Sequence, residues 1–390
     1  MRLFFSRLLQ HMRAGAMAFL CLLLLLSACS TSTKQVQTPQ RSSLFSLMDA
    51  FLTSKVEAQQ FSGTALVARS GHILLDKGYG LANADRSLVN TPTTLFGIGS
   101  VTKEFTAMAI LILQERGKLH IHDRICTYLS PCPQAWQAIT IYELLTHSSG
   151  IPNHFERSGI NLKQLETEPV DFKPGTQFNY SNSGYVVLAT LIEKVSGEAY
   201  GTFLQQNIFT PVQMRHTGYD FTQPQLANMA IGYASTQFKV DETGISLEFG
   251  ADGLYSTVED LYRWDQALFT HTQTLVSSQA LNQMFTNTVT LCPGAQASTC
   301  SSAYIYIPSI FLPATISSPV SMKYGFGWFI ATVEGSTAPI IYHGGSTWGF
   351  KAYNVFYSED NVTIIVLSNL LLTNPGAITQ SLYQIVTTKV

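Results

Sequence analysis

The apolar positions of this 390-residue chain repeat with two periods, one typical of helices and one typical of strands. A helix is predicted over about residues 44–59, and a mostly helical pattern covers about residues 105–285. Strand patterns occupy both ends of the chain, near residues 63–69, 72–80, 325–333, 339–343, 350–357 and 363–368, and a last helix starts at Pro375. Strands at both ends around a helical middle predict an α+β fold, in which one antiparallel sheet carries an inserted helical lobe.

A Ser-x-x-Lys motif opens the first helix of this middle region. Ser100 and Lys103 are three residues apart, and the apolar residues that follow them repeat at helical spacing. Residues three apart lie on the same side of a helix, so the Ser100 hydroxyl and the Lys103 amine can meet. The unpaired N–H groups of a helix start favour negative charge beside the serine. This pattern predicts a serine nucleophile with a neighbouring base, and the alternative is a capped helix with a surface lysine.

Two further short motifs follow at long distances along the chain. Tyr180 and Asn182 lie in a polar, turn-rich segment directly before an apolar run that predicts a helix. His343 and Gly345 lie at the end of a short apolar strand. Each motif is weak by itself, because such turns are common. Together, in the order Ser-x-x-Lys, Tyr-x-Asn and His-x-Gly, the three motifs are a more specific signal than any one of them alone.

In these motifs the chain resembles the serine β-lactamase and penicillin-binding protein family, and in particular its branch of class C β-lactamases, D,D-peptidases, D-aminopeptidases and esterases. The resemblance covers the chain from about residue 43 to the C-terminus and implies a β-lactamase/transpeptidase-like fold. Several other stretches are also similar to the family: 144–152, 174–175, 253–257, 324–328 and 365–369.

The resemblance implies a role for each site residue. Ser100 would be the nucleophile that forms an acyl-enzyme, and either Lys103 or Tyr180 would be its base. Asn182 would orient the substrate. The oxyanion hole would consist of the backbone N–H groups of Ser100 and of Ser346, which follows Gly345. No cofactor is expected, and the substrate would be a small molecule or a peptide, such as a fragment of peptidoglycan.

His343 departs from the β-lactamase pattern, which has a lysine at this position. A histidine is mostly neutral near pH 7, so its attraction for a penicillin carboxylate should be weaker and should grow as the ring gains a proton below about pH 6.5. The expected activity is therefore that of a D,D-peptidase or esterase. A true β-lactamase and a non-catalytic cell-envelope binding protein that keeps the fold are the alternatives. An α/β-hydrolase lipase is disfavoured, because no complete Gly-x-Ser-x-Gly is present.

The first 28 residues have the pattern of a secretory signal, with three arginines before an apolar run and small residues at its end. The sequence Leu-Ser-Ala-Cys at 26–29 resembles a bacterial lipobox, which would make Cys29 the lipidated first residue of the mature protein. Residues 29–42 are predicted to be a flexible tether and residues 43–390 the hydrolase domain. The expected location is the periplasmic face of the outer membrane, and the alternative is a soluble periplasmic or secreted protein.

The remaining cysteines form two pairs that are close in sequence, Cys126 with Cys132 and Cys292 with Cys300. In an exported protein such pairs predict disulfides, because the compartment is oxidising. A zinc site is disfavoured by the cysteine spacing. The charge pattern contains no basic run, so a nucleic-acid partner is not expected. An apparent insertion over 287–322 has no predicted role.

Overall fold

The computed structural model describes residues 39–154, 162–220, 226, 228–236, 238–240, 249–270, 273–291, 319–333 and 335–388. Residues 44–390 form one compact unit, and residues 1–43 form another, of which only the start of a helix is described. The predicted signal peptide, the lipidation site Cys29 and most of the tether therefore lie outside the described residues. No helix within the described part of the chain is both long and apolar enough to span a membrane.

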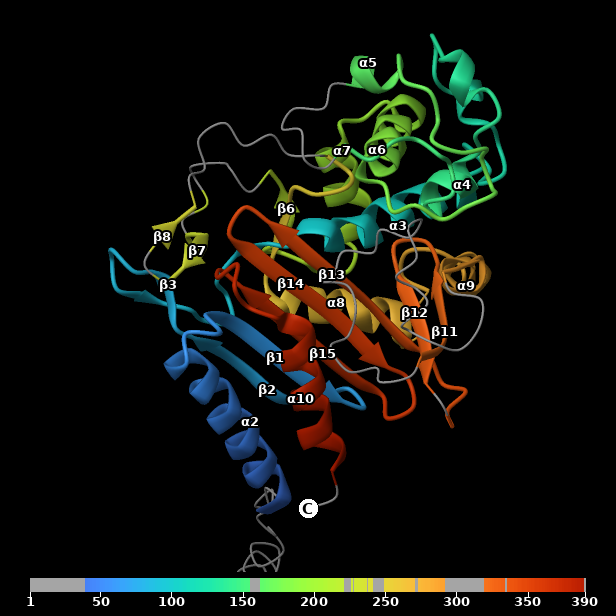
Figure 1. Ribbon diagram of the computed structural model, residues 1–390. Coiled ribbons are helices and arrows are strands. Elements are labelled where there is room, and N and C mark those ends of the chain that lie inside the picture. The colour runs from blue at the N-terminus through green and yellow to red at the C-terminus, as the bar shows by residue number, and fades with distance from the viewer. Residues whose placement is uncertain are drawn as a thin grey trace, which may run out of the picture. The chain divides into compact units, whose positions relative to one another are not determined.

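The main element is an antiparallel sheet of eight strands, ordered β10-β11-β12-β13-β14-β15-β1-β2 (Figure 1). The N-terminal hairpin pairs with the C-terminal strands, as the strand patterns at both ends of the chain predicted. The strands are β1 (Gly63–Arg69), β2 (His72–Tyr79), β10 (Val289–Thr290), β11 (Pro319–Tyr324), β12 (Phe329–Val333), β13 (Ile340–Thr347), β14 (Phe350–Tyr357) and β15 (Val362–Ser368).

Strand alternation gives the sheet two apolar faces, and each face is covered by helices. One face packs on α2 (Pro39–Glu57) and α10 (Pro375–Thr387), which contribute Leu52 and Leu382 to a shared core. The opposite face packs on α8 (Val258–Phe269), whose Trp264 belongs to the larger core. Figure 1 shows α2 and α10 in front of the sheet and α8 behind it.

The middle of the chain forms the inserted lobe, which contains more than helices. Its helices are α3 (Thr102–Glu115), α4 (Ile141–Leu145), α5 (Leu162–Leu165), α6 (Asn182–Ser196), α7 (Tyr200–Leu204) and α9 (Ser278–Thr286). Three small sheets were not predicted. In one of them β9 (Leu254–Ser256) is the central strand and pairs with both β5 (Phe96–Gly97) and β6 (Gly218–Tyr219). The other two pair β3 (Leu81–Asn83) with β4 (Leu88–Val89), and β7 (Tyr233–Ser235) with β8 (Phe238–Lys239). Strands of two or three residues are too short to show a period in sequence.

The predicted insertion over 287–322 begins and ends in the main sheet. Its first and last parts form β10 and β11, which extend the sheet beyond β12. A strand pair separated by nearly thirty residues carries no hairpin signal, which explains why it was not predicted. The middle of the insertion, with Cys292 and Cys300, lies outside the described residues, so their disulfide remains a prediction. The other predicted disulfide, Cys126–Cys132, is present.

A pair of buried carboxyl groups joins α3 to the sheet. The Asn354 amide on β14 donates to Asp265 Oδ1 at 2.8 Å and to Glu104 Oε2 at 3.4 Å. Both acids are fully buried. Burial and the neighbouring Asp265 charge raise the pKa of Glu104 well above its usual value. Burial raises the pKa of Asp265 to about 8, although the bond from Asn354 opposes this shift. The pair therefore favours its protonated form.

We expect Asp265→Asn to weaken the pH dependence of stability. Between about pH 4 and 8 the folded protein keeps a proton on Asp265 that the unfolded chain has released. Stability therefore falls as pH rises through this window, by at most about 1.4 kcal/mol per pH unit from this group. Asparagine has the same shape and does not ionise. Urea unfolding at pH 5, 6, 7 and 8 measures the slope, and Glu57→Gln at an exposed position is the control. Equal slopes for the native protein and Asp265→Asn would contradict this prediction.

Candidate active site

The lobe meets the sheet where a short 3₁₀ turn, η1 (Gly99–Val101), approaches β13. Two glycines permit this approach. Gly99 has a φ of +53°, and a Cβ on it would lie 2.6 Å from the Ser346 backbone nitrogen. A Cβ on Gly345 would lie 2.0 Å from the Ile98 carbonyl oxygen. Side chains at these positions would push the two segments apart, so the glycines place Ser100 beside the end of β13.

Ser100 and Lys103 meet as their spacing predicted. Ser100 lies in η1, directly before α3, rather than in the first turn of the α-helix itself. The Lys103 Nζ lies 3.0 Å from the Ser100 Oγ. The Lys103 side chain is fully buried, and Ser100 is 6% exposed. A buried amine within hydrogen-bond distance of a serine hydroxyl can take up the proton that this hydroxyl loses when it attacks.

Two oxygen atoms hold the Lys103 amine in place. Its Nζ donates to Asn182 Oδ1 at 2.7 Å and to the Ala251 carbonyl oxygen at 2.9 Å. A charged ammonium would direct its third proton toward Ser100. A neutral amine would still donate to both oxygens, and its lone pair would accept the proton of the Ser100 hydroxyl. The same geometry therefore serves the amine before and after it accepts a proton.

Tyr180 lies beside this pair, two residues before Asn182. Its side chain is 3% exposed, and the Lys103 Nζ is 4.9 Å from the centre of its ring. Ser181 caps α6, because its hydroxyl accepts a hydrogen bond from the Gly184 backbone N–H. This cap fixes where the helix begins and hence where Tyr180 and Asn182 stand on either side of it. All three members of the predicted catalytic group are thus brought together.

The His147 ring packs against the Tyr180 ring, and this role of His147 was not predicted. Its Nδ1 accepts a hydrogen bond from the Ser181 backbone N–H at 3.1 Å, and its ring centre is 4.3 Å from that of Tyr180. Burial and the Lys103 charge lower the pKa of His147 well below its usual value, so the ring is neutral. Its φ of +55° is rare for a residue with a side chain. The histidine was visible in the 144–152 stretch, but nothing local indicated what it contacts.

Three other contacts of the site were not predicted. The Ala251 carbonyl and the Asn153 side chain belong to loops, and Asn153 Oδ1 accepts the Asn182 backbone N–H at 3.1 Å. Tyr324 lies on β11 and contacts the His343 ring. Only Tyr324 had a sequence signal, because it begins the family-like stretch 324–328. Backbone carbonyls have no side-chain identity, so no motif can reveal them.

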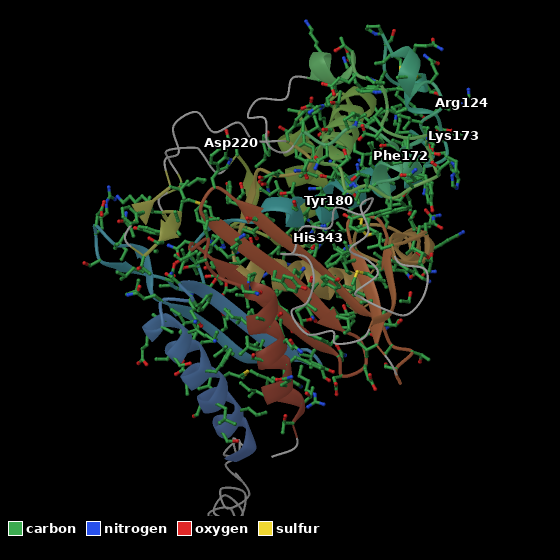
Figure 2. All side chains as sticks on the ribbon, in the orientation of Figure 1. Arg124, Phe172, Lys173, Tyr180, Asp220 and His343 are labelled. Atoms are coloured by element: carbon green, nitrogen blue, oxygen red, sulfur yellow. A yellow bond between two sulfur atoms is a disulfide. The ribbon has the colours of Figure 1, made fainter. Side chains whose placement is uncertain are left out.

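His343 lies on β13 and is fully buried. Figure 2 shows Tyr180 and His343 close to the line where the lobe meets the sheet, and their ring centres are 6.2 Å apart. The His343 Nδ1 donates to the Gly344 carbonyl oxygen at 2.6 Å, so its Nε2 accepts the Tyr324 hydroxyl proton at 3.2 Å. Burial, followed by the Lys103 charge, lowers the pKa of His343 to about 3.

This environment corrects the expectation that His343 gains a proton below about pH 6.5. A ring with a pKa of about 3 is neutral throughout the range in which the protein would work. Burial penalises the imidazolium ion, and Lys103 adds a further unfavourable charge nearby. A neutral ring should attract a substrate carboxylate only weakly at any pH in this range. The predicted increase of this attraction below about pH 6.5 is therefore not expected.

We therefore expect the His343 ring to show no titration between pH 5.5 and 8. Nitrogen NMR of protein labelled at its histidine rings measures this directly, and the His343→Gln spectrum identifies the signal. The shifts should be those of a neutral ring protonated on Nδ1. A titration midpoint inside this range would show that the ring is more hydrated than its burial indicates.

Among the described residues, no group of three His, Cys, Asp or Glu side chains is arranged to hold a metal ion. The residues brought together around Ser100 are an amine, a phenol, an amide and backbone N–H groups. Groups of these types are suited to proton transfer and to binding an oxyanion.

Comparison with known proteins agrees with this arrangement. The family model Beta-lactamase matches residues 48–388. A relative from Bacillus subtilis (strain 168) carries the name "Putative penicillin-binding protein PbpX". It is 33% identical to this chain over 335 residues, which cover 83% of this chain and 75% of PbpX.

Solved structures of penicillin-binding proteins are also similar to this chain. An octameric penicillin-binding protein homologue from Pyrococcus abyssi has a TM-score of 0.71 at 25% identity, covering 88% of this chain and 77% of that one. A penicillin-binding protein from Bacillus halodurans has a TM-score of 0.69 at 25% identity, covering 86% of this chain and 98% of that one. The chain therefore belongs to the Beta-lactamase family, whose members are typically serine hydrolases.

Proposed function

We propose that this protein is an exported serine acyl-hydrolase that cleaves amide or ester bonds through an acyl-enzyme on Ser100. The observation that carries this proposal is the 3.0 Å contact between the Ser100 Oγ and the buried Lys103 Nζ. The contact lies beside the end of β13. β12 pairs only with residues 340–342 of β13, and no described strand pairs with the remaining part of that edge.

The proposed reaction begins when the Ser100 Oγ attacks the substrate carbonyl and its proton passes to Lys103. The backbone N–H groups of Ser100 and Ser346 stabilise the oxyanion that forms, because the glycine contacts hold these two backbones together. The proton then moves to the leaving group, and the acyl group remains on Ser100. A water molecule, whose proton passes to Lys103 or Tyr180, then attacks the acyl carbon, so that the acyl group leaves as a carboxylic acid and the Ser100 hydroxyl is restored. Tyr180 is the other candidate for this proton transfer, and its ring next to Lys103 supports a shared role.

The substrate class follows from His343. A neutral ring in the place of a lysine offers no charge to a β-lactam carboxylate. Because His-x-Gly also resembles the motif of D,D-peptidases, D-aminopeptidases and esterases, we favour an activity like that of a D,D-peptidase or an esterase, on a peptide or small molecule such as a peptidoglycan fragment. A true β-lactamase is the alternative. A purely binding role is disfavoured, because Ser100, Lys103 and Tyr180 are all present and close together.

We further propose that the protein is exported and anchored by a lipid on Cys29, with its domain in the periplasm. The N-terminal sequence pattern is the main support. The Cys126–Cys132 disulfide agrees with an oxidising compartment. Metabolic labelling with a radioactive fatty acid tests the anchor, since a Cys29→Ser variant should lose the label.

The activity is tested with purified protein and three substrate classes: the β-lactam nitrocefin, neutral p-nitrophenyl esters and peptides ending in D-Ala-D-Ala. We expect turnover of an ester or a D-Ala-D-Ala peptide, with slower turnover of nitrocefin. Faster hydrolysis of nitrocefin than of the other two would identify a β-lactamase instead. No turnover of any class and no covalent adduct with a fluorophosphonate probe would support the binding role and overturn the proposal.

A further inference from the structure

A pocket with aromatic walls lies in the inserted lobe, apart from the catalytic group. It has a volume of about 600 Å³ and is formed where the end of α6 and the start of α7 meet β6, β9 and Phe249. Figure 1 shows α6, α7 and β6 next to one another in the lobe. Its lining does not include Ser100, Lys103, Tyr180 or Asn182. The volume is typical of a site for a small molecule.

Three aromatic rings of this pocket contact one another. The Tyr200 ring is buried, and its hydroxyl forms a hydrogen bond with the Thr106 hydroxyl at 2.8 Å. The centre of the Tyr219 ring lies 5.5 Å from that of Tyr200, and the centre of the Phe249 ring lies 5.9 Å from it. Both rings stand nearly perpendicular to the Tyr200 ring, at 87° and 85°. Tyr219 and Phe249 are partly exposed, so a ligand in the pocket can reach their rings.

Close packing holds these rings in place. A Cβ on Gly201 would lie 3.1 Å from the Tyr219 Cβ, which shows how closely α7 approaches β6. A Cβ on Gly218 would lie 2.4 Å from the hydroxyl oxygen of Tyr255, a fourth aromatic residue of the lining. The rings are therefore arranged before any ligand binds, and a pre-arranged site loses less entropy on binding.

The charge around the rings is negative. Glu193 lines the pocket, and the described lining contains no lysine, arginine or histidine. One Glu193 oxygen accepts the Tyr200 backbone N–H at 2.9 Å, and the carboxylate forms no ion pair with any described residue. Burial raises the pKa of Tyr219 to about 12, and the negative charges of Asp220 and Glu193 add to this shift. The pocket therefore favours a cation over an anion.

An organic ammonium ion fits both the rings and the charge. The faces of aromatic rings are negative and attract a cation that lies over them. A primary ammonium is strongly hydrated, whereas methyl groups around the nitrogen provide apolar surface that packs on the rings. The Glu193 carboxylate would repel an anion, and it would give a neutral apolar ligand no charge attraction.

We propose that this pocket binds the organic ammonium group of a small molecule, with Tyr219 and Phe249 against its methyl groups and Glu193 as its counter-charge. This binding site goes beyond the proposed function. Its occupancy does not require turnover at Ser100, so the site and the hydrolase activity can be tested separately.

The test compares two molecules of the same shape. Choline carries a quaternary nitrogen, and 3,3-dimethyl-1-butanol has a carbon atom in its place, so the two differ in charge. Titration by saturation-transfer NMR at pH 7 and low salt measures the Kd of each. We expect a Kd for choline on the order of 1 mM, as for a small ligand with few contacts. The neutral molecule should bind at least about tenfold more weakly, because it lacks the cation–π attraction.

Variants of the pocket show where choline binds. Tyr219→Leu should weaken choline binding about tenfold, and Tyr219→Phe should stay within about threefold of native because the ring is retained. Glu193→Gln should weaken it about threefold or more, although glutamine can still accept the Tyr200 N–H. Tyr383→Leu removes a partly exposed tyrosine of α10, and Glu57→Gln removes an exposed charge. Both are controls and should bind choline as the native protein does, and thermal unfolding shows that each variant is folded.

The possible outcomes separate an ammonium site from other kinds of pocket. Selective binding of choline that is lost in Tyr219→Leu and weakened in Glu193→Gln supports the proposal. Equal binding of choline and the neutral molecule, or choline binding that neither variant changes, overturns it. Binding of N-acetylglucosamine in a Tyr219-dependent manner, without binding of choline, would identify a sugar site and would also overturn it.

Discussion

Ser100→Ala is expected to abolish covalent labelling and to lower turnover of the best substrate by about 10,000-fold or more, as loss of a serine nucleophile does in serine hydrolases. The reason is that the Oγ of Ser100 is the hydroxyl within 3.0 Å of the Lys103 amine, beside the glycine-lined end of β13. Without this oxygen no acyl-enzyme can form. Binding and the oxyanion donors would leave only a small residual rate.

Intact-mass spectrometry after reaction with a penicillin or a fluorophosphonate measures the labelling. The native protein should gain one adduct, and tryptic mapping should place it on Ser100. Ser256→Ala is a matched control, since Ser256 is also a buried serine but lies on β9 and forms a hydrogen bond with Thr217. An adduct of equal yield on Ser100→Ala would show that another residue is the nucleophile.

Lys103→Met should slow acylation by about 100-fold to 10,000-fold, the range for loss of a general base. Methionine keeps the length of the side chain and removes the amine. Asn182 Oδ1 and the Ala251 carbonyl would then lose their donor in a buried site. We therefore also expect a loss of stability of about 1–3 kcal/mol, the cost of an unsatisfied buried polar group. Stopped-flow acylation and urea unfolding measure the two effects separately.

Tyr180→Phe is the matched comparison, because it removes only a hydroxyl. If Lys103 is the acylation base, Tyr180→Phe should retain more acylation activity than Lys103→Met. If the tyrosine is the base, the order should reverse. Near-native acylation by Lys103→Met would exclude the lysine, whatever its distance from Ser100. The contact of 3.0 Å between Lys103 and Ser100 leads us to expect the first result.

The parts of this protein that the sequence predicted depend on neighbours along the chain. The Ser100–Lys103 contact follows from one helical turn, and the start of α6 after Tyr180 follows from a polar segment before an apolar run. The N-terminal hairpin and the C-terminal strands were predicted because strand periods are local. The order of the three motifs along the chain then indicated the family, and the family indicated how the two ends form one sheet.

The tertiary structure decided the properties that depend on burial and on distant segments. His343 looked like an ordinary histidine in sequence, but complete burial beside Lys103 lowers its pKa to about 3. His147 packs against Tyr180, a contact between two segments that no local pattern links. Desolvation and charge interactions act through space, so the protonation of a group depends on side chains that are remote in sequence. For this reason the motifs predicted which residues gather at the site, and only the fold determined which of them carry a charge.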